Sequence, residues 1–159
     1  MYQHILIATD GSELSKLALR EGIALAKALD ARVTAVTVTK PFHILTADPV
    51  MIEATPQTYQ RHMAAVAGQY LQVAKDIAAA AGIACNAVHV EHEHPYRAII
   101  DTAQNQGCDV IEMASHGRGG LSAILLGSET LKVLTHSPIP VIVCRRPDMA
   151  TLIRQSFAS

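Results

Sequence analysis

Short apolar segments alternate along the chain with longer segments of helical spacing. The segment His4–Ala8 is almost entirely apolar and ends in a polar turn, as expected for a strand that is buried on both faces. From Ser12 to Leu29, apolar residues recur at helical spacing, and Ser12 can cap the first turn. The segment Val33–Val38 is short and rich in β-branched residues, so its pattern predicts a second strand.

The same alternation continues in the second half of the chain. Residues 58–81 contain no proline and stop before Gly82, so this segment is the longest predicted helix. The further predicted elements are a strand over 83–91, a helix from Pro95 to Gly107, a strand over 109–114, a short helix from Gly127 to His136 and a last strand over 141–145. The connection 39–57 contains Pro41, Pro49 and Pro56, and we expect it to form a long, lid-like loop.

Alternating strands and helices predict a single α/β domain. Parallel strands need right-handed crossovers, so helices would cover both faces of one doubly wound, mainly parallel five-stranded sheet. The domain covers residues 1–146, and the tail 147–159 lies outside this scheme with no assigned role. In such sheets the ligand lies beyond the carboxyl ends of the strands, where the winding reverses. We therefore expect Asp10, Val38 and the loop after Ala114 to meet at one end of the sheet.

Composition and charge limit the classes of partner. A hydrophobic fraction of 50% in 159 residues is ample for one packed core, and a formal net charge of -1 gives no broad basic field for nucleic acid. No apolar run reaches the roughly 18 residues of a membrane span, and the first residues do not resemble a secretory signal. We therefore expect a cytoplasmic protein without nucleic-acid or membrane partners. Cys85, Cys108 and Cys144 have no CxxC spacing and are expected to be reduced thiols.

A glycine-bearing loop follows the predicted strand 109–114. Residues 115–120 read Ser-His-Gly-Arg-Gly-Gly, and Gly127 with Ser128 opens the next helix. Glycines let the backbone approach an anion closely, and a helix N-terminus supplies N–H donors and a positive dipole end. The Ser128 hydroxyl and the Arg118 guanidinium can add bonds to a phosphate. A loop that only reverses the chain is the alternative that these residues leave open.

This loop resembles the ATP-binding motif of the universal stress protein family. The motif is G-x-x-G, nine residues and G-[ST]; here Ala114 to Gly117, the nine residues 118–126 and Gly127-Ser128 share its spacing. The starting sequence ILIATDGS and the closing sequence PIPVIVCR are similar to the family's first and last strands. Ala114 departs from the motif's first glycine. Its methyl group is a small obstacle if the backbone φ is negative there, and a serious one if φ is positive.

The resemblance implies a Rossmann-like fold that binds ATP. A divalent ion, Mg or Mn, would bridge the phosphates, because backbone donors alone do not neutralise a triphosphate. Asp10 would lie on the nucleoside side, with capping of the first helix as its alternative role. Val38 would read the adenine edge through its backbone, with strand packing as the alternative. The residues assigned to the nucleotide are Ala8, Thr9, Asp10, Val38, Met113, Ala114, Ser115, Gly117, Arg118, Gly127 and Ser128.

The resemblance also implies a homodimer that acts as a stress-response regulator or sensor. The last strand, with Val141, Ile142 and Val143, would pair antiparallel with its copy in a second subunit; a tail that folds back over this edge is the alternative. No general base lies near the loop in sequence, so we expect slow or no turnover and assign no catalytic residue. A dimer of the same fold that binds no nucleotide, and a small-molecule hydrolase or transferase, are the competing functions.

A group of histidines, His89, His92 and His94, offers metal-ligand chemistry together with Glu91 and Glu93. In an extended strand, His92 and His94 share a face and His89 points to the other. We therefore interpret the group as a polar strand end and predict no metal site.

Overall fold

The computed structural model describes residues 1–43, 55–117 and 126–146. The strands are β1 (His4–Ala8), β2 (Arg32–Thr39), β3 (Cys85–Glu91), β4 (Val110–Ala114) and β5 (Val141–Cys144). The helices are α1 (Glu13–Leu29), α3 (Pro56–Ala81), α4 (Pro95–Asn105) and α5 (Ser128–His136). Arg118, residues 44–54 of the expected loop and the tail 147–159 lie outside the described residues, so the expectations for them stay predictions.

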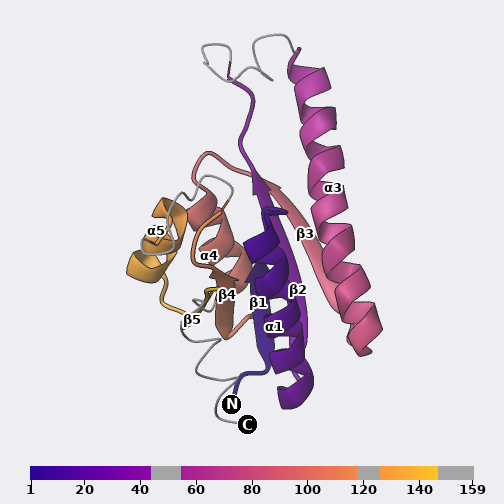
Figure 1. Cartoon of the computed structure of the whole chain (residues 1–159). Coiled ribbons are helices and arrows are strands. Elements are labelled where there is room, and N and C mark those ends of the chain that lie inside the picture. Colours follow the sequence, from indigo (N-terminus) through magenta and orange to yellow (C-terminus); the bar gives the residue numbers. More distant parts are fainter. Residues whose placement is uncertain (44–54, 118–125, 147–159) are drawn as a thin grey trace.

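The strands form one parallel sheet in the order β3-β2-β1-β4-β5 (Figure 1). β1 is central and pairs with β2 on one side and with β4 on the other. The chain therefore winds outward from β1 to β3, returns to the far side of β1, and winds outward again to β5. This confirms the doubly wound α/β fold, with its reversal between β1 and β4.

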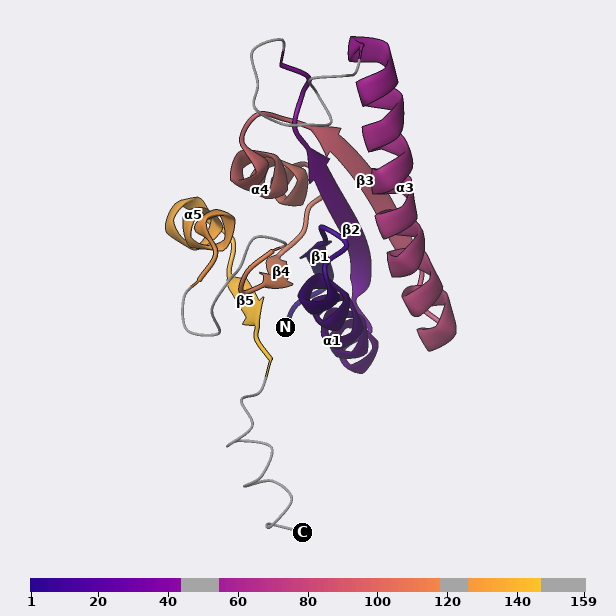
Figure 2. The same cartoon turned by 45° about the horizontal axis from the view of Figure 1, so that its top comes forward.

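Helices cover both faces of the sheet, as Figures 1 and 2 show. α1 and α3 pack on one face, where Ile5 and Ile7 of β1 join residues such as Leu71 of α3 in one core. α4 and α5 pack on the other face, where Leu6 of β1 joins Ile99 of α4. Because successive residues of a strand point to opposite faces, the continuous apolar run of β1 fills both cores.

Local sequence signals set the helix ends. At the start of α1, the Ser12 hydroxyl accepts a bond from a backbone N–H at 3.2 Å, as the sequence predicted. α3 begins at Pro56, earlier than the apolar pattern indicated, because Thr55 forms a capping box with Thr58 and proline suits the first turn. Gly82 ends α3 in the left-handed conformation, with a φ of 76°.

Candidate functional site

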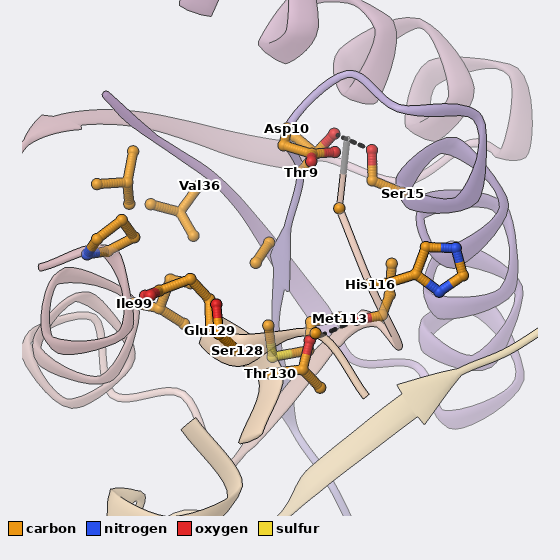
Figure 3. A pocket seen from close by; sticks show the side chains of 16 residues that line it. Thr9, Asp10, Ser15, Val36, Ile99, Met113, His116, Ser128, Glu129 and Thr130 are labelled. Carbon is orange, nitrogen blue, oxygen red and sulfur yellow. Dashed lines mark hydrogen bonds between the residues drawn. The ribbon is translucent and has the colours of Figure 1, made fainter. Parts of the chain in front are cut away.

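A pocket of about 440 Å³ lies at the carboxyl ends of β1, β2 and β4, where the winding of the sheet reverses. Its apolar lining residues are Ala8, Val36, Val38, Pro95, Ile99, Met113 and Ala114. Its other lining residues, polar or glycine, are Thr9, Asp10, Ser15, His116, Gly117, Gly127, Ser128, Glu129 and Thr130. Figure 3 shows these side chains gathered around one cavity. The volume falls in the usual range of small-molecule sites.

The turn after β1 places Asp10 at the pocket. Gly11 has a left-handed φ of 77°, and the Ser12 N–H donates to Asp10 Oδ1 at 3.0 Å. The Asp10 carboxylate is therefore held by the turn and stands beside the N-terminus of α1. Its Oδ2 atom lies 2.5 Å from the point where a β-carbon of Gly117 would stand. Glycine at position 117 thus lets the loop after β4 come close to this carboxylate.

Hydroxyl groups brace the same turn. The Thr9 and Ser15 hydroxyl oxygens lie 3.1 Å apart, as the dashed line in Figure 3 shows. The Thr37 hydroxyl of β2 donates to the Thr9 carbonyl at 3.0 Å. The end of β1 is therefore fixed to both α1 and β2, which gives Asp10 a rigid base.

The loop after β4 returns to the sheet at Gly127. The Gly127 N–H donates to the Ser115 carbonyl at 2.7 Å, and a β-carbon on Gly127 would lie 3.1 Å from His116 Cα. Gly127 has a φ of -61°, so the close approach of two chain segments, and not a positive φ, requires glycine here. Ser115 is buried, at 4% exposure, and unlike His116 it is not among the residues that line the pocket.

Ala114 ends β4 at the pocket wall without backbone strain. Among the described non-glycine residues, only Asp30 has a positive φ. The Ala114 carbonyl accepts a bond from the Thr130 hydroxyl at 2.9 Å, which joins the end of β4 to the first turn of α5. Because φ is not positive at Ala114, the methyl group that stands in place of the motif's first glycine is only a small obstacle to the ligand.

α5 begins at the pocket without a side-chain cap. Its N-cap residue, Gly127, makes no side-chain bond to the first-turn N–H groups. Such N–H groups, together with the positive end of the helix dipole, favour an anion. Ser128, Glu129 and Thr130 of this first turn line the pocket, so the anion-binding end of α5 opens into it.

The structure brings most of the sequence-assigned residues together. Those that line the pocket are Ala8, Thr9, Asp10, Val38, Met113, Ala114, Gly117, Gly127 and Ser128. The lining residues that sequence reasoning missed are Ser15, Val36, Pro95, Ile99, His116, Glu129 and Thr130. Glu129 and Thr130 could have been predicted from the sequence, because they follow Ser128 in the first turn of the predicted helix. Pro95 and Ile99 were not, because only the strand order shows that α4 begins beside the pocket.

The described thiols are poor nucleophiles. Burial raises the pKa of Cys108 to about 11 and that of Cys144 to about 12. Glu21 adds to the rise at Cys144, because its Oε2 atom accepts a bond from the Cys144 sulfur at 3.2 Å. Burial also raises the pKa of Cys85. These thiols give no support to a cysteine-dependent hydrolase or transferase.

The histidines near the end of β3 have local partners. His89 Nε2 lies 2.8 Å from the Thr39 hydroxyl, and the His94 N–H donates to His92 Nδ1 at 2.8 Å. Within residues 1–43, 55–117 and 126–146, no group of three or more His, Cys, Asp or Glu side chains is placed to hold a metal ion. No helix in these residues is long and apolar enough to cross a membrane.

The strand order and the pocket at its reversal define a doubly wound α/β protein with a ligand site at the switch point. The model of the universal stress protein family matches residues 1–145, and the chain belongs to this family.

Relatives match over nearly the whole chain. Universal stress protein MJ0531 of Methanocaldococcus jannaschii is 31% identical over 149 residues, which cover 92% of this chain and 84% of that protein. Universal stress protein YxiE of Bacillus subtilis is 28% identical over 149 residues, which cover 91% of this chain and 100% of that protein.

Solved structures share the fold. Hypothetical protein MJ0577 superposes with a TM-score of 0.77 at 28% identity, over 93% of this chain and 99% of that one. UspA of Lactobacillus plantarum superposes with a TM-score of 0.68 at 26% identity, over 91% of this chain and 98% of that one.

Proposed function

We propose that the protein binds ATP, with Mg or Mn bridging the phosphates, and acts as a homodimeric regulator or sensor of the stress response. The observation that carries the proposal is the pocket at the switch point of the sheet, which apolar and polar residues line together. Apolar lining residues such as Val38 and Ile99 suit a purine, and the uncapped N-terminus of α5 suits phosphates. The cytoplasm as its location stays a prediction.

Asp10 supports a ribose between the base and the phosphates. Its carboxylate can accept bonds from ribose hydroxyls, because each carboxylate oxygen can accept more than one hydrogen bond. It borders Gly117, next to the loop that would hold the phosphates. Val38, at the end of β2, is one of the apolar lining residues on which the base would rest.

The charge of the described lining residues supports a divalent ion. Asp10 brings a carboxylate to the pocket lining, and no lysine or arginine is among the described residues that line it. A triphosphate therefore needs an added cation, which Mg or Mn would supply by bridging its oxygens. Arg118, which lies outside the described residues, can add a guanidinium to the phosphates.

Two more structures with this fold are complexes with adenine nucleotides. One is a universal stress protein in complex with cAMP, at 23% identity and a TM-score of 0.67. The other is the universal stress protein of Archaeoglobus fulgidus in complex with dAMP, at 22% identity and a TM-score of 0.64. At these identities they establish only the fold for this chain, and their ligands make adenine nucleotides the first compounds to test.

Titration calorimetry of the nucleotide-free protein with ATP and Mg tests the proposal. We expect saturable heat with a dissociation constant on the order of micromolar. Gly127→Val should abolish this heat, because the added side chain would push against the His116 backbone and displace the loop. Gly68→Val is the matched control, since nothing lies within 4 Å of a β-carbon there.

A flat trace for the parent protein at near-millimolar ATP would contradict nucleotide binding. It would favour the alternative function, a dimer of the same fold that binds no nucleotide. Equal binding by the parent and Gly127→Val would show that the loop does not hold the phosphates. Thermal melting of each variant establishes that it is folded before it is titrated. We expect turnover to be slow or absent, because the His116 imidazole is paired with the Ser115 hydroxyl at 3.2 Å and no ion pair joins it to a carboxylate of the described residues.

A further inference from the structure

Two helices begin at the pocket, and their first turns differ in one respect. α4 begins at Pro95 and α5 at Ser128, and neither N-cap residue, His94 or Gly127, makes a side-chain cap bond. In α4 a distant residue supplies the missing acceptor, because Glu129 Oε2 accepts a bond from the Tyr96 N–H at 2.9 Å. The α4 end is therefore already occupied by a carboxylate, and the α5 end remains for an anion of the ligand.

Each of the two carboxylate oxygens of Glu129 accepts a hydrogen bond from a protein group. Its Oε1 atom accepts a bond from the Lys132 ammonium at 2.9 Å, while Oε2 is held by α4. Figure 3 shows the side chain reaching from α5 toward Ile99 of α4. Each carboxylate oxygen can accept more than one bond, so the two partners leave acceptor capacity for a ligand. A side chain held in this way needs little reorganisation when the ligand binds.

The position of the Glu129 carboxylate decides which groups of a ligand it can attract. The carboxylate accepts its bond from the first turn of α4, and α4 contributes the apolar residues Pro95 and Ile99 to the pocket lining. A carboxylate accepts hydrogen bonds and cannot donate them. At this place it attracts an N–H donor on the ligand and repels a carbonyl oxygen or a phosphate.

We infer that Glu129 is a specificity-determining residue of the pocket, which selects a base with an exocyclic amino group and directs the phosphates to α5. The inference rests on the proposed function, because it assigns the base to the α4 side. It distinguishes adenine, which carries an amino group at C6, from hypoxanthine, which carries an oxygen there.

Competitive titration with ATP and ITP, each with Mg, tests the inference. We expect the parent to bind ATP about tenfold more tightly than ITP, as a single directed donor–acceptor pair can achieve. Glu129→Gln keeps an acceptor for the Tyr96 N–H but presents an amide N–H₂ to the ligand. Its preference for ATP should disappear or invert toward ITP. Glu129→Ala removes both the acceptor for the Tyr96 N–H and the acceptor for the ligand, so it should bind the two nucleotides about equally.

The matched control is Glu13→Gln. Glu13 lies in the first turn of α1 and pairs with Lys16 at 2.7 Å, as Glu129 does with Lys132, but it does not line the pocket. Its ATP-to-ITP ratio should equal that of the parent. If Glu129 only joins α4 to α5, its replacement would lower the affinity for ATP and for ITP by the same factor. The ATP-to-ITP ratio would then equal that of the parent, and this result would overturn the inference. A parent that binds neither nucleotide overturns the proposed function and this inference together.

Discussion

Glu112 is a carboxyl group in the middle of the sheet, outside the pocket. It is 2% exposed, and its Oε2 atom has no hydrogen-bond partner among the described residues. α1 can pack over it because Gly22 has no side chain; a β-carbon there would lie 2.7 Å from Oε2. Burial, and to a lesser degree the negative charge of Glu21, raises the pKa of Glu112 to about 7.

This pKa predicts that the protein loses stability as the pH rises. Between pH 4.5, the ordinary pKa, and about 7, the unfolded chain ionises Glu112 while the folded chain keeps the proton. The free energy of unfolding therefore falls through this range, by about 3 kcal/mol in all. Glu112→Gln cannot ionise, so we expect it to be more stable than the parent at pH 8 by an amount of this order, and equal to it near pH 4. Urea denaturation at the two pH values measures the difference.

Glu91→Gln provides the control, because Glu91 is an exposed carboxylate on β3. It should change the stability by less than about 0.5 kcal/mol at either pH. If Glu112→Gln were less stable than the parent at pH 8, the Glu112 carboxylate would have a stabilising partner in the folded chain, and the assignment of a raised pKa would be wrong.

At the scale of elements, α3 contacts the turn that carries Asp10. The ring of Tyr70 lies against Gly11, so closely that a β-carbon on Gly11 would overlap it. Gly11 also has a φ of 77°, a conformation that residues with a side chain rarely adopt. The structure thus shows two separate reasons for glycine at this turn, and they can be measured separately.

Gly11→Ala and Gly82→Ala separate the two reasons. Both glycines have a left-handed φ, of 77° and 76°, but nothing lies within 4 Å of a β-carbon on Gly82. Gly82→Ala should therefore lower the free energy of unfolding by about 1 kcal/mol through the backbone alone. Gly11→Ala should cost more, because Tyr70 must also move. In a Tyr70→Ala background the excess should vanish, and a double-mutant cycle of urea denaturation curves measures it.

Equal losses for Gly11→Ala and Gly82→Ala would show that Tyr70 adjusts without cost and that α3 does not hold the turn. ATP titration of Tyr70→Ala adds a functional readout. Since the same turn carries Asp10, weaker binding by a folded Tyr70→Ala protein would connect α3 to the proposed site.

How far the sequence predicts these elements depends on the range of the signal. Apolar periodicity and caps act over a few residues, so the strands, the start of α1 at Ser12 and the end of α3 at Gly82 were predictable. The cap of α4 was not, because its acceptor Glu129 lies 33 residues further along the chain. The same holds for the contact of Tyr70 with Gly11, which depends on how α3 packs against the rest of the fold.

At the scale of the whole molecule, β5 lies at one edge of the sheet, and its outer side pairs with no other strand of the described residues. The Pro140 carbonyl accepts a bond from Ile111 of β4, and the Cys144 carbonyl accepts one from Ser115, the residue after β4. In a parallel ladder the N–H groups of Val141 and Val143 therefore point away from β4. Leu131 and Leu134 of the neighbouring α5 are 54% and 40% exposed. The edge and these leucines support the proposed pairing of β5 with its copy around a two-fold axis.

Proline substitutions on the two edges of the sheet test this assembly. We expect the parent to be a dimer by light scattering, and Val141→Pro/Val143→Pro to be a monomer, because it removes the outward donors and spares the bonds to β4. Ala87→Pro/His89→Pro removes outward donors from β3, on the opposite edge, and should remain a dimer. A monomeric parent, or a dimer that only the β3 prolines disrupt, would place the interface elsewhere.

The central place of β1 has a consequence for the synthesis of the protein on the ribosome. β2 covers one side of β1 early, but β4, which covers the other side, is made about 100 residues after β1. At the usual rate of about 5–20 residues per second, the second edge of β1 stays open for roughly 5–20 s. An incomplete chain released in this interval carries an apolar open edge, which other chains can pair with and chaperones can recognise. It also lacks α5, so the proposed nucleotide could stabilise only the finished protein.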